Sequence, residues 1–125
     1  MVPALELSTS QESLLRIRWI AILYGRVQSS LAVTGGIHTV QDVVKSLLAG
    51  ADVTHMCSAL LHHGPGHLGV VLRELQQWLE EHEYESVSQL KGSISQANAI
   101  DSAAFLRANY MQVLESYQRP PGVLW

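Results

Sequence analysis

The sequence has little cysteine, little charge and no basic excess, and each shortage excludes a class of protein. A single cysteine, Cys57, excludes an internal disulfide framework. The 8 Lys and Arg against 11 Asp and Glu give a net charge of −3, which provides no basic surface for nucleic acid or an anionic membrane. Only 15% of the 125 residues are charged and 47% are hydrophobic, whereas soluble domains average about 25% charged residues. A small domain has much surface per residue, and this chain has few charged side chains to cover it. We therefore expect part of its surface to be buried against another protein segment or chain.

The chain also lacks a long apolar run that could cross a membrane. Its longest stretch without a formal charge, residues 53–72, is interrupted by Gly64-Pro65-Gly66 and contains four histidines. The N-terminus has neither the basic region nor the apolar core of a signal peptide. We therefore expect a cytoplasmic protein with no membrane partner.

Short apolar runs alternate with helical patterns along the chain. Apolar runs bounded by turn residues predict three strands, at residues 4–7, 31–34 and 53–57. Apolar residues at helical spacing predict helices at 12–27, 39–50, 66–81 and 101–117, with a single helical turn at 86–90. The helix at 12–27 is apolar around most of its axis, so we expect it to be buried on more than one side. Strands alternating with helices predict parallel βαβ units, an α/β fold.

Two loops carry the residues best suited to binding an anion. Thr34-Gly35-Gly36 follows one predicted strand, and Cys57-Ser58 follows the next. Parallel strands place these loops side by side, and glycine lets the backbone approach a ligand closely. Backbone N–H groups at helix starts then favour a phosphate. A plain βα turn requires the same glycines, so the spacing alone leaves both interpretations open.

The order of motifs is more specific than the glycine pair. The segment LAVTGGIHTVQDVVKSLLAGADVTHMCSALLHHGP, followed by LRELQQWLEEHEYESVSQLKGSISQ, closely resembles the C-terminal part of dihydroorotate dehydrogenase-like FMN flavoproteins. The upstream LELSTS and RIRWIAILYGRV, and the closing AFLRANYMQVLESY, fit the same family. The resemblance extends over roughly Leu5 to Tyr117.

This resemblance implies a partial (β/α)8 TIM barrel made of the last three βα units. The family oxidises dihydroorotate, or a related dihydropyrimidine, to orotate in pyrimidine biosynthesis, with FMN at the C-terminal face of the strands. It implies that the FMN phosphate is held by Thr34, Gly35, Gly36, Cys57 and Ser58. Ser8 and Thr9 then lie near flavin and substrate. The chain departs from the family pattern in two places, because Cys57 stands where glycine is usual and LSTSQES replaces a glycine-rich loop.

The resemblance covers only part of the family's barrel, and the part that it does not cover contains the residues needed for activity. A complete barrel has about 250 residues, and the family's catalytic base and the lysines that contact flavin lie on earlier loops. We therefore assign no catalytic residue and expect the chain alone to be inactive. It divides into residues 1–95, the barrel part with the phosphate loops, and 96–125, an appended C-terminal helix and tail. The alternative is a truncated, non-catalytic half-barrel that associates with itself or with a chain supplying the other strands.

Histidines and the cysteine admit other interpretations. His62, His63 and His67 are potential zinc ligands, but no acidic or cysteine partner has a recognisable spacing, so we expect no metal site. His38 follows the glycine pair and lies either near the phosphate or at a helix start on the surface. Cys57 at a helix start could be a reactive thiol, because a helix N-terminus lowers a thiol pKa. Its position favours a loop residue instead.

Overall fold

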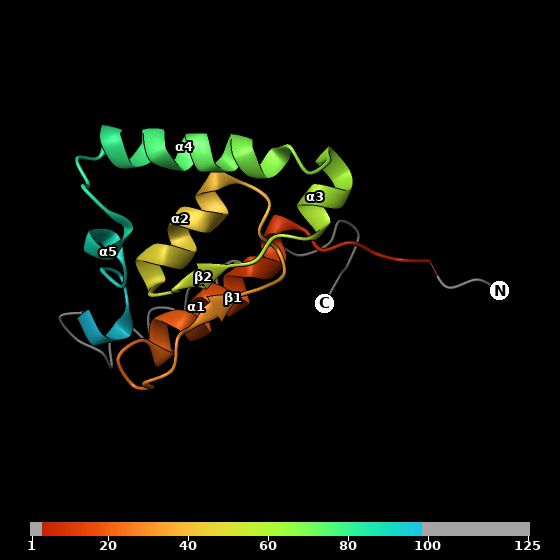
Figure 1. Cartoon of the computed structure of the whole chain (residues 1–125). Helices are drawn as coiled ribbons and strands as arrows, with labels where there is room; N and C mark the ends of the chain where they lie inside the picture. The colour runs from red at the N-terminus through yellow and green to blue at the C-terminus, as the bar shows by residue number, and fades with distance from the viewer. Residues whose placement is uncertain (1–3, 99–125) are drawn as a thin grey trace, which may run out of the picture.

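The computed structural model describes residues 4–98 and forms a small α/β unit (Figure 1). Helices surround one short parallel sheet. In chain order the elements are η1 (Ser10–Glu12), α1 (Ser13–Leu23), β1 (Ala32–Val33), α2 (Val40–Ala49), β2 (Val53–Thr54), α3 (Ser58–His63), α4 (His67–Glu81), α5 (Val87–Leu90) and η2 (Gln96–Asn98). The predicted helix at 101–117, and with it most of the proposed C-terminal segment, lies outside the described residues.

The sheet confirms one predicted βαβ unit. β1 and β2 pair in parallel with Ala32 opposite Val53, and α2 makes the crossover between them. The pairing extends beyond both ends of the strands, since Asp52 N–H donates to the Leu31 carbonyl at 2.7 Å and His55 N–H donates to the Val33 carbonyl at 2.8 Å. Both strands are shorter than predicted, but their C-terminal ends lie side by side.

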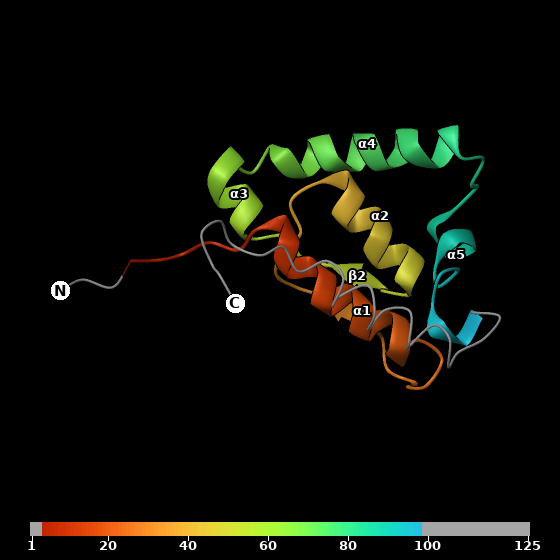
Figure 2. The same ribbon diagram turned by 180° about the vertical axis from the view of Figure 1, so that it is seen from behind.

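The strand predicted at residues 4–7 is wrong for this structure. These residues have no regular secondary structure, and the segment runs away from the body of the molecule (Figures 1 and 2). Leu5 is 82% exposed. An apolar run has strand propensity, but a strand needs a hydrogen-bonded neighbour, and this one pairs with neither β1 nor β2. The described residues therefore hold a two-stranded sheet rather than the expected three strands of a barrel.

The first long helix is also less buried than predicted. α1 ends at Leu23 rather than at residue 27, and Gly25 follows with φ +79°. Ile20 and Ala21 are buried, whereas Leu14 and Trp19 are 58% and 55% exposed. The expectation of burial on more than one side is wrong, because α1 packs against α2, η2 and β1 while Leu14 and Trp19 stay exposed.

The helix after β1 has the expected boundaries for a visible reason. The Thr39 side chain accepts from the Asp42 N–H while the Asp42 carboxylate accepts from the Thr39 N–H, a reciprocal capping box. Gly50 ends the helix with φ +120°. Its packing against Tyr24 explains why glycine stands there, because a Cβ at this position would lie 2.3 Å from the Tyr24 ring.

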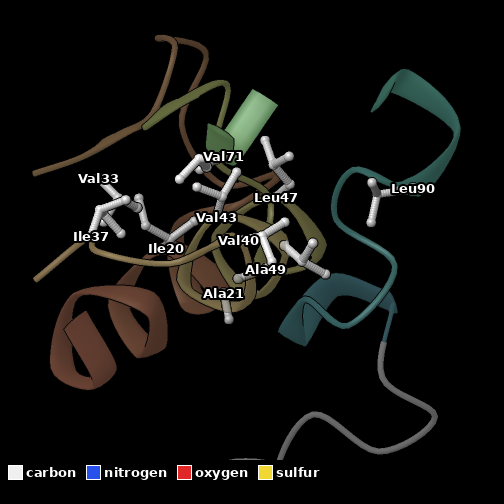
Figure 3. Close-up of a cluster of buried hydrophobic side chains, with 12 residues drawn as sticks. Ile20, Ala21, Val33, Ile37, Val40, Val43, Leu47, Ala49, Val71 and Leu90 are labelled. Carbon is white, nitrogen blue, oxygen red and sulfur yellow. The ribbon is translucent and has the colours of Figure 1, made fainter. Parts of the chain in front are cut away.

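The core is built around α2, which lies between α1 and α4 (Figure 1). Figure 3 shows its buried side chains gathered from β1, α1, α2, α4 and α5. α4 contributes only Val71 as a fully buried residue, whereas Leu68 and Leu72 on the same helix are 47% and 57% exposed. No helix among residues 4–98 is both long enough and apolar enough to cross a membrane.

Candidate functional site at the strand ends

The two predicted loops and the N-terminal segment meet at one hydroxyl group, that of Ser8. Its oxygen accepts a hydrogen bond from the Gly36 N–H at 3.2 Å. The same hydroxyl donates to the Ser58 hydroxyl oxygen at 3.0 Å. Residues 28 and 50 positions apart in the sequence are thereby joined at the C-terminal ends of β1 and β2. The structure thus brings together three of the predicted site residues, Ser8, Gly36 and Ser58.

Gly36 is required by close backbone packing. It has φ +83°, and a Cβ built there would lie 2.5 Å from the Ser13 nitrogen and 2.9 Å from the Thr9 carbonyl oxygen. Real Cβ atoms are not found at such distances from backbone atoms, and a positive φ already disfavours other residues. Gly36 therefore allows the backbone of its loop to pack directly against the backbone at the start of η1 and α1. Thr9 contributes its backbone carbonyl to this contact.

Gly35 lies beneath a cationic side chain. A Cβ built on Gly35, which has φ +87°, would lie 3.0 Å from Nε of Arg16 and 3.1 Å from its Cζ and Nη2. The Arg16 side chain is held by a hydrogen bond from Nη1 to the Glu12 carbonyl, one turn earlier in the chain. Arg16 and Thr34 also line a shared pocket of about 430 Å³ beside β1. Arg16 belongs to none of the sequence motifs that predict the site.

A buried carboxylate fixes the loop from the other side. Asp42 is 5% exposed. Its Oδ2 accepts from the Ser10 hydroxyl at 2.8 Å, from the His38 N–H at 3.0 Å and from the Thr39 N–H at 3.1 Å. The carboxylate therefore ties η1 to the chain between Gly36 and α2. The Thr39-x-x-Asp42 spacing is a capping-box signal that could have identified this role from the sequence.

Cys57 lies at the N-cap position of α3 and does not join this network. Its side chain makes no cap hydrogen bond, while its carbonyl accepts from the Leu60 and Leu61 N–H groups at 3.0 and 3.1 Å. The residue is exposed and its thiol is free. Among the five residues predicted for the phosphate, the structure thus joins Gly36 and Ser58 through the Ser8 hydroxyl, places Gly35 and Thr34 beside Arg16, and leaves Cys57 outside this network.

Four histidines gather near the same strand ends. The ring centroids of His38 and His62 lie 6.2 Å apart, and those of His63 and His67 lie 4.7 Å apart. His67 Nε2 lies 2.8 Å from the His38 carbonyl oxygen, and His38 Nε2 is buried without a hydrogen-bond partner. No group of three or more His, Cys, Asp or Glu side chains within residues 4–98 has the arrangement to hold a metal ion.

An ion pair with shifted pKa values, Asp52 and Lys91, lies away from this site, at the opposite ends of the strands. The Lys91 ammonium donates to Asp52 at 2.5 Å, and the Leu31 N–H donates to the same carboxylate at 2.8 Å. These hydrogen bonds, that from Lys91 first, lower the pKa of Asp52, and the reverse interaction raises the pKa of Lys91. The ion pair links the loop before β2 to the segment after α5. Its distance from the glycine loop assigns it a structural role.

Comparison with known proteins gives partial matches to one group of enzymes. No family model matches the chain. It is 34% identical over 76 residues to dihydroorotate dehydrogenase (quinone) of Rhodospirillum rubrum, which covers 59% of the chain and 21% of that protein. It is 29% identical over 77 residues to dihydroorotate dehydrogenase A (fumarate) of Lactococcus lactis, covering 60% of the chain and 25% of that protein.

A third relative carries a related name. The chloroplastic dihydropyrimidine dehydrogenase (NADP(+)) of Arabidopsis thaliana is 27% identical over 63 residues, covering 50% of the chain and 15% of that protein. The chain thus spans a quarter or less of the length of the relatives described here. It is similar in sequence to a part of the dihydroorotate and dihydropyrimidine dehydrogenases, which confirms the resemblance that its motifs indicate.

Proposed function

We propose that this chain is the phosphate-binding portion of a dihydroorotate dehydrogenase-like oxidoreductase. In this proposal the chain is the C-terminal part of a (β/α)8 barrel and holds the phosphate of FMN with the loops after β1 and β2, and the enzyme oxidises dihydroorotate or a related dihydropyrimidine. The observation that carries the proposal is the convergence of the Gly36 N–H and the Ser58 hydroxyl on one oxygen atom, that of Ser8. The similarity to named dehydrogenases supplies the reaction class.

The residues at this point fit a phosphate group. Phosphate oxygens are hydrogen-bond acceptors, and the donors here are a backbone N–H and hydroxyl groups, as at many phosphate sites. Ser58 accepts from Ser8, which leaves its own O–H to donate to a further acceptor. Gly36 seats its loop against backbone atoms of Thr9 and Ser13, so the N–H direction is fixed before a ligand arrives. Fixed donors bind an anion without a further ordering penalty.

The chain's own residues would position the cofactor, and FMN when bound supplies the redox chemistry. The glycine loop and Ser58 would bind the phosphate end. Ser8 and Thr9, on the segment leading into η1, would lie between that end and the substrate. In this proposal none of these residues would take a proton from a substrate carbon, because they would bind the phosphate end or lie next to it. We therefore expect the isolated chain to show no dihydroorotate oxidation, even with added FMN.

The test compares FMN with riboflavin, which has the same ring and no phosphate. FMN should bind the full chain at least about tenfold more tightly than riboflavin, because a charged hydrogen-bonded group contributes about 1.5–3 kcal/mol. Ser58→Ala should weaken FMN binding and leave riboflavin binding unchanged. Ser93→Ala is the matched control, since Ser93 is an exposed serine outside the strand-end loops. Equal affinity of the full chain for FMN and riboflavin would refute the proposal.

A second candidate function is a non-catalytic half-barrel that associates with itself or a partner chain. The observation that favours it is exposed apolar surface on α1 and α4, where Leu15 and Leu72 are 61% and 57% exposed. Such surface drives association in soluble proteins. The two candidates separate by colour and cofactor content. A yellow protein with stoichiometric FMN after purification supports the first, and a colourless protein that binds neither FMN nor phosphate supports the second.

A further inference from the structure

We infer that Arg16 supplies the positive charge of the phosphate site. The inference rests on the function proposed above and adds a ligand that the loop motifs do not contain. Arg16 lies on α1, one element before the glycine loop in the chain, and its guanidinium lies against Gly35. No sequence motif links these two residues. Only the folded arrangement of α1 against β1 brings them together.

The distances place the guanidinium within electrostatic reach of the loop donors. Its Nε lies 3.0 Å from the position of a Gly35 Cβ. Standard bond lengths put that position about 3 Å from the next backbone nitrogen, so the guanidinium lies at most about 6 Å from the Gly36 nitrogen. This is within the Debye length of about 8 Å at physiological ionic strength. A phosphate bound at this loop would therefore be attracted by the charge of Arg16.

The local charges explain why a cation is needed there. The groups that meet at Ser8 are neutral, since the Gly36 N–H donates to the Ser8 oxygen and the Ser58 hydroxyl oxygen accepts from it. The Asp42 carboxylate accepts from the N–H of His38, two residues beyond Gly36, and so brings a buried negative charge close to the loop. A phosphate monoester carries nearly two negative charges at neutral pH. An adjacent guanidinium offsets the repulsion between the two anions.

Arg16 is anchored at one end of its guanidinium and open at the other. Nη1 donates to the Glu12 carbonyl, which fixes the group over Gly35. A guanidinium has five N–H donors in a planar fork, so the remaining donors can pair with two phosphate oxygens. The side chain is exposed and shares the 430 Å³ pocket with Thr34, so an anion can reach it from solvent.

The absence of a Cβ at Gly35 gives this arrangement a second support. A Cβ at this position would require the guanidinium to shift by a few tenths of an ångström, because Nε, Cζ and Nη2 lie 3.0–3.1 Å from it. Glycine at position 35 thus allows the close contact with Arg16 as well as the positive φ, while glycine at position 36 allows the contact with the backbone of Ser13. The two glycines of the motif have separate tasks.

The experiment measures FMN and riboflavin binding by fluorescence for the full chain and its variants, at low and at physiological salt. Arg16→Ala should weaken FMN binding about tenfold or more and leave riboflavin binding unchanged. Arg16→Lys should recover part of the loss, because lysine keeps the charge without the planar fork. Arg73→Ala, which removes the same charge from α4, is the control and should leave FMN binding unchanged. Thermal unfolding of each variant shows that the fold is retained.

Three outcomes separate this inference from the proposed function. Selective loss of FMN affinity in Arg16→Ala, with a weaker salt dependence than the parent chain, supports both. FMN binding that exceeds riboflavin binding, with equal affinities for Arg16→Ala and Arg73→Ala, overturns the role of Arg16 and leaves the phosphate site standing. No preference for FMN over riboflavin in the parent chain overturns the phosphate site and the role of Arg16 with it.

Discussion

Replacing Gly36 by alanine should destabilise the fold by about 2–4 kcal/mol. Part of this loss is backbone strain, because Gly36 has φ +83° and the left-handed region costs other residues about 1–2 kcal/mol. The larger part comes from the new Cβ, 2.5 Å from the Ser13 nitrogen and 2.9 Å from the Thr9 oxygen. Neither atom can rotate away, and overpacking of this kind costs about 1–3 kcal/mol.

Gly25 provides a control for the strain alone. It has φ +79°, close to that of Gly36, but the nearest atom to its Cβ position is the Ala97 Cβ at 3.5 Å, an ordinary van der Waals contact. Gly25→Ala should therefore cost about 1 kcal/mol, the strain partly offset by the lower conformational entropy of the unfolded chain. The difference between the two variants isolates the price of the close backbone contact, about 1–3 kcal/mol.

The assay is urea or thermal unfolding followed by circular dichroism, with all variants at one protein concentration because association shifts apparent stability. At about 4 °C per kcal/mol, Gly25→Ala should lower the Tm by about 4 °C and Gly36→Ala by about 8–16 °C. Equal losses for the two variants would refute the reasoning, because they would show that Gly36 does not press against the start of α1. A loss of FMN binding in Gly36→Ala would then need unfolding data before it could be assigned to the site.

Three further predictions concern the Asp42 carboxylate, the Asp52–Lys91 ion pair and the exposed apolar face of α1. Asp42→Ala should lower stability by about 2–3 kcal/mol in urea unfolding, because it leaves buried donors unpaired, and Asp42→Asn should cost less; equal stability of Asp42→Ala and the parent chain contradicts this. Because the pKa of Asp52 is lowered in the folded state, its contribution to the free energy of unfolding is present above the unfolded pKa near 4 and is lost as the pH falls through the folded pKa. Asp52→Asn should therefore reduce the pH dependence of the free energy of unfolding in acid. At neutral pH its effect on stability should stay below about 1 kcal/mol, because the pair with Lys91 is exposed. Leu15→Gln with Trp19→Gln should shift the chain toward monomer in sedimentation velocity, because these exposed side chains form the open face of α1; an unchanged sedimentation coefficient would exclude this face from any self-association.

The parts of the fold that the sequence predicted well are those specified by local chemistry. Thr39 and Gly50 set the ends of α2 through a capping box and a positive φ. The loop positions follow from that βαβ unit, so the meeting of Gly36 and Ser58 at the strand ends was predictable from spacing. Sequence-local signals of this kind act within a few residues and do not depend on what packs around them.

The predictions that were wrong concern features that depend on packing partners, which a local sequence pattern does not reveal. The run at residues 4–7 has strand propensity but no pairing partner, so it stays unpaired outside the sheet. The apolar residues of α1 predicted burial on several sides, yet Leu14 and Trp19 remain exposed. Arg16 was missed because its relation to Gly35 arises from helix packing, and a cation one element away from a glycine loop has no fixed spacing.

These failures share one physical cause, and it bears on function. Residues 4–7 pair with neither strand, and the exposed face of α1 adjoins β1, whose second edge has no partner among the described residues. A pocket of about 430 Å³ lies along the same edge, lined by Trp19 of α1 and by the residues of β1. An unpaired parallel strand beside exposed apolar side chains is a surface suited to receive another strand. The low charge content of the chain and the exposed apolar side chains of α1 fit such a surface, beside a glycine loop that is already formed.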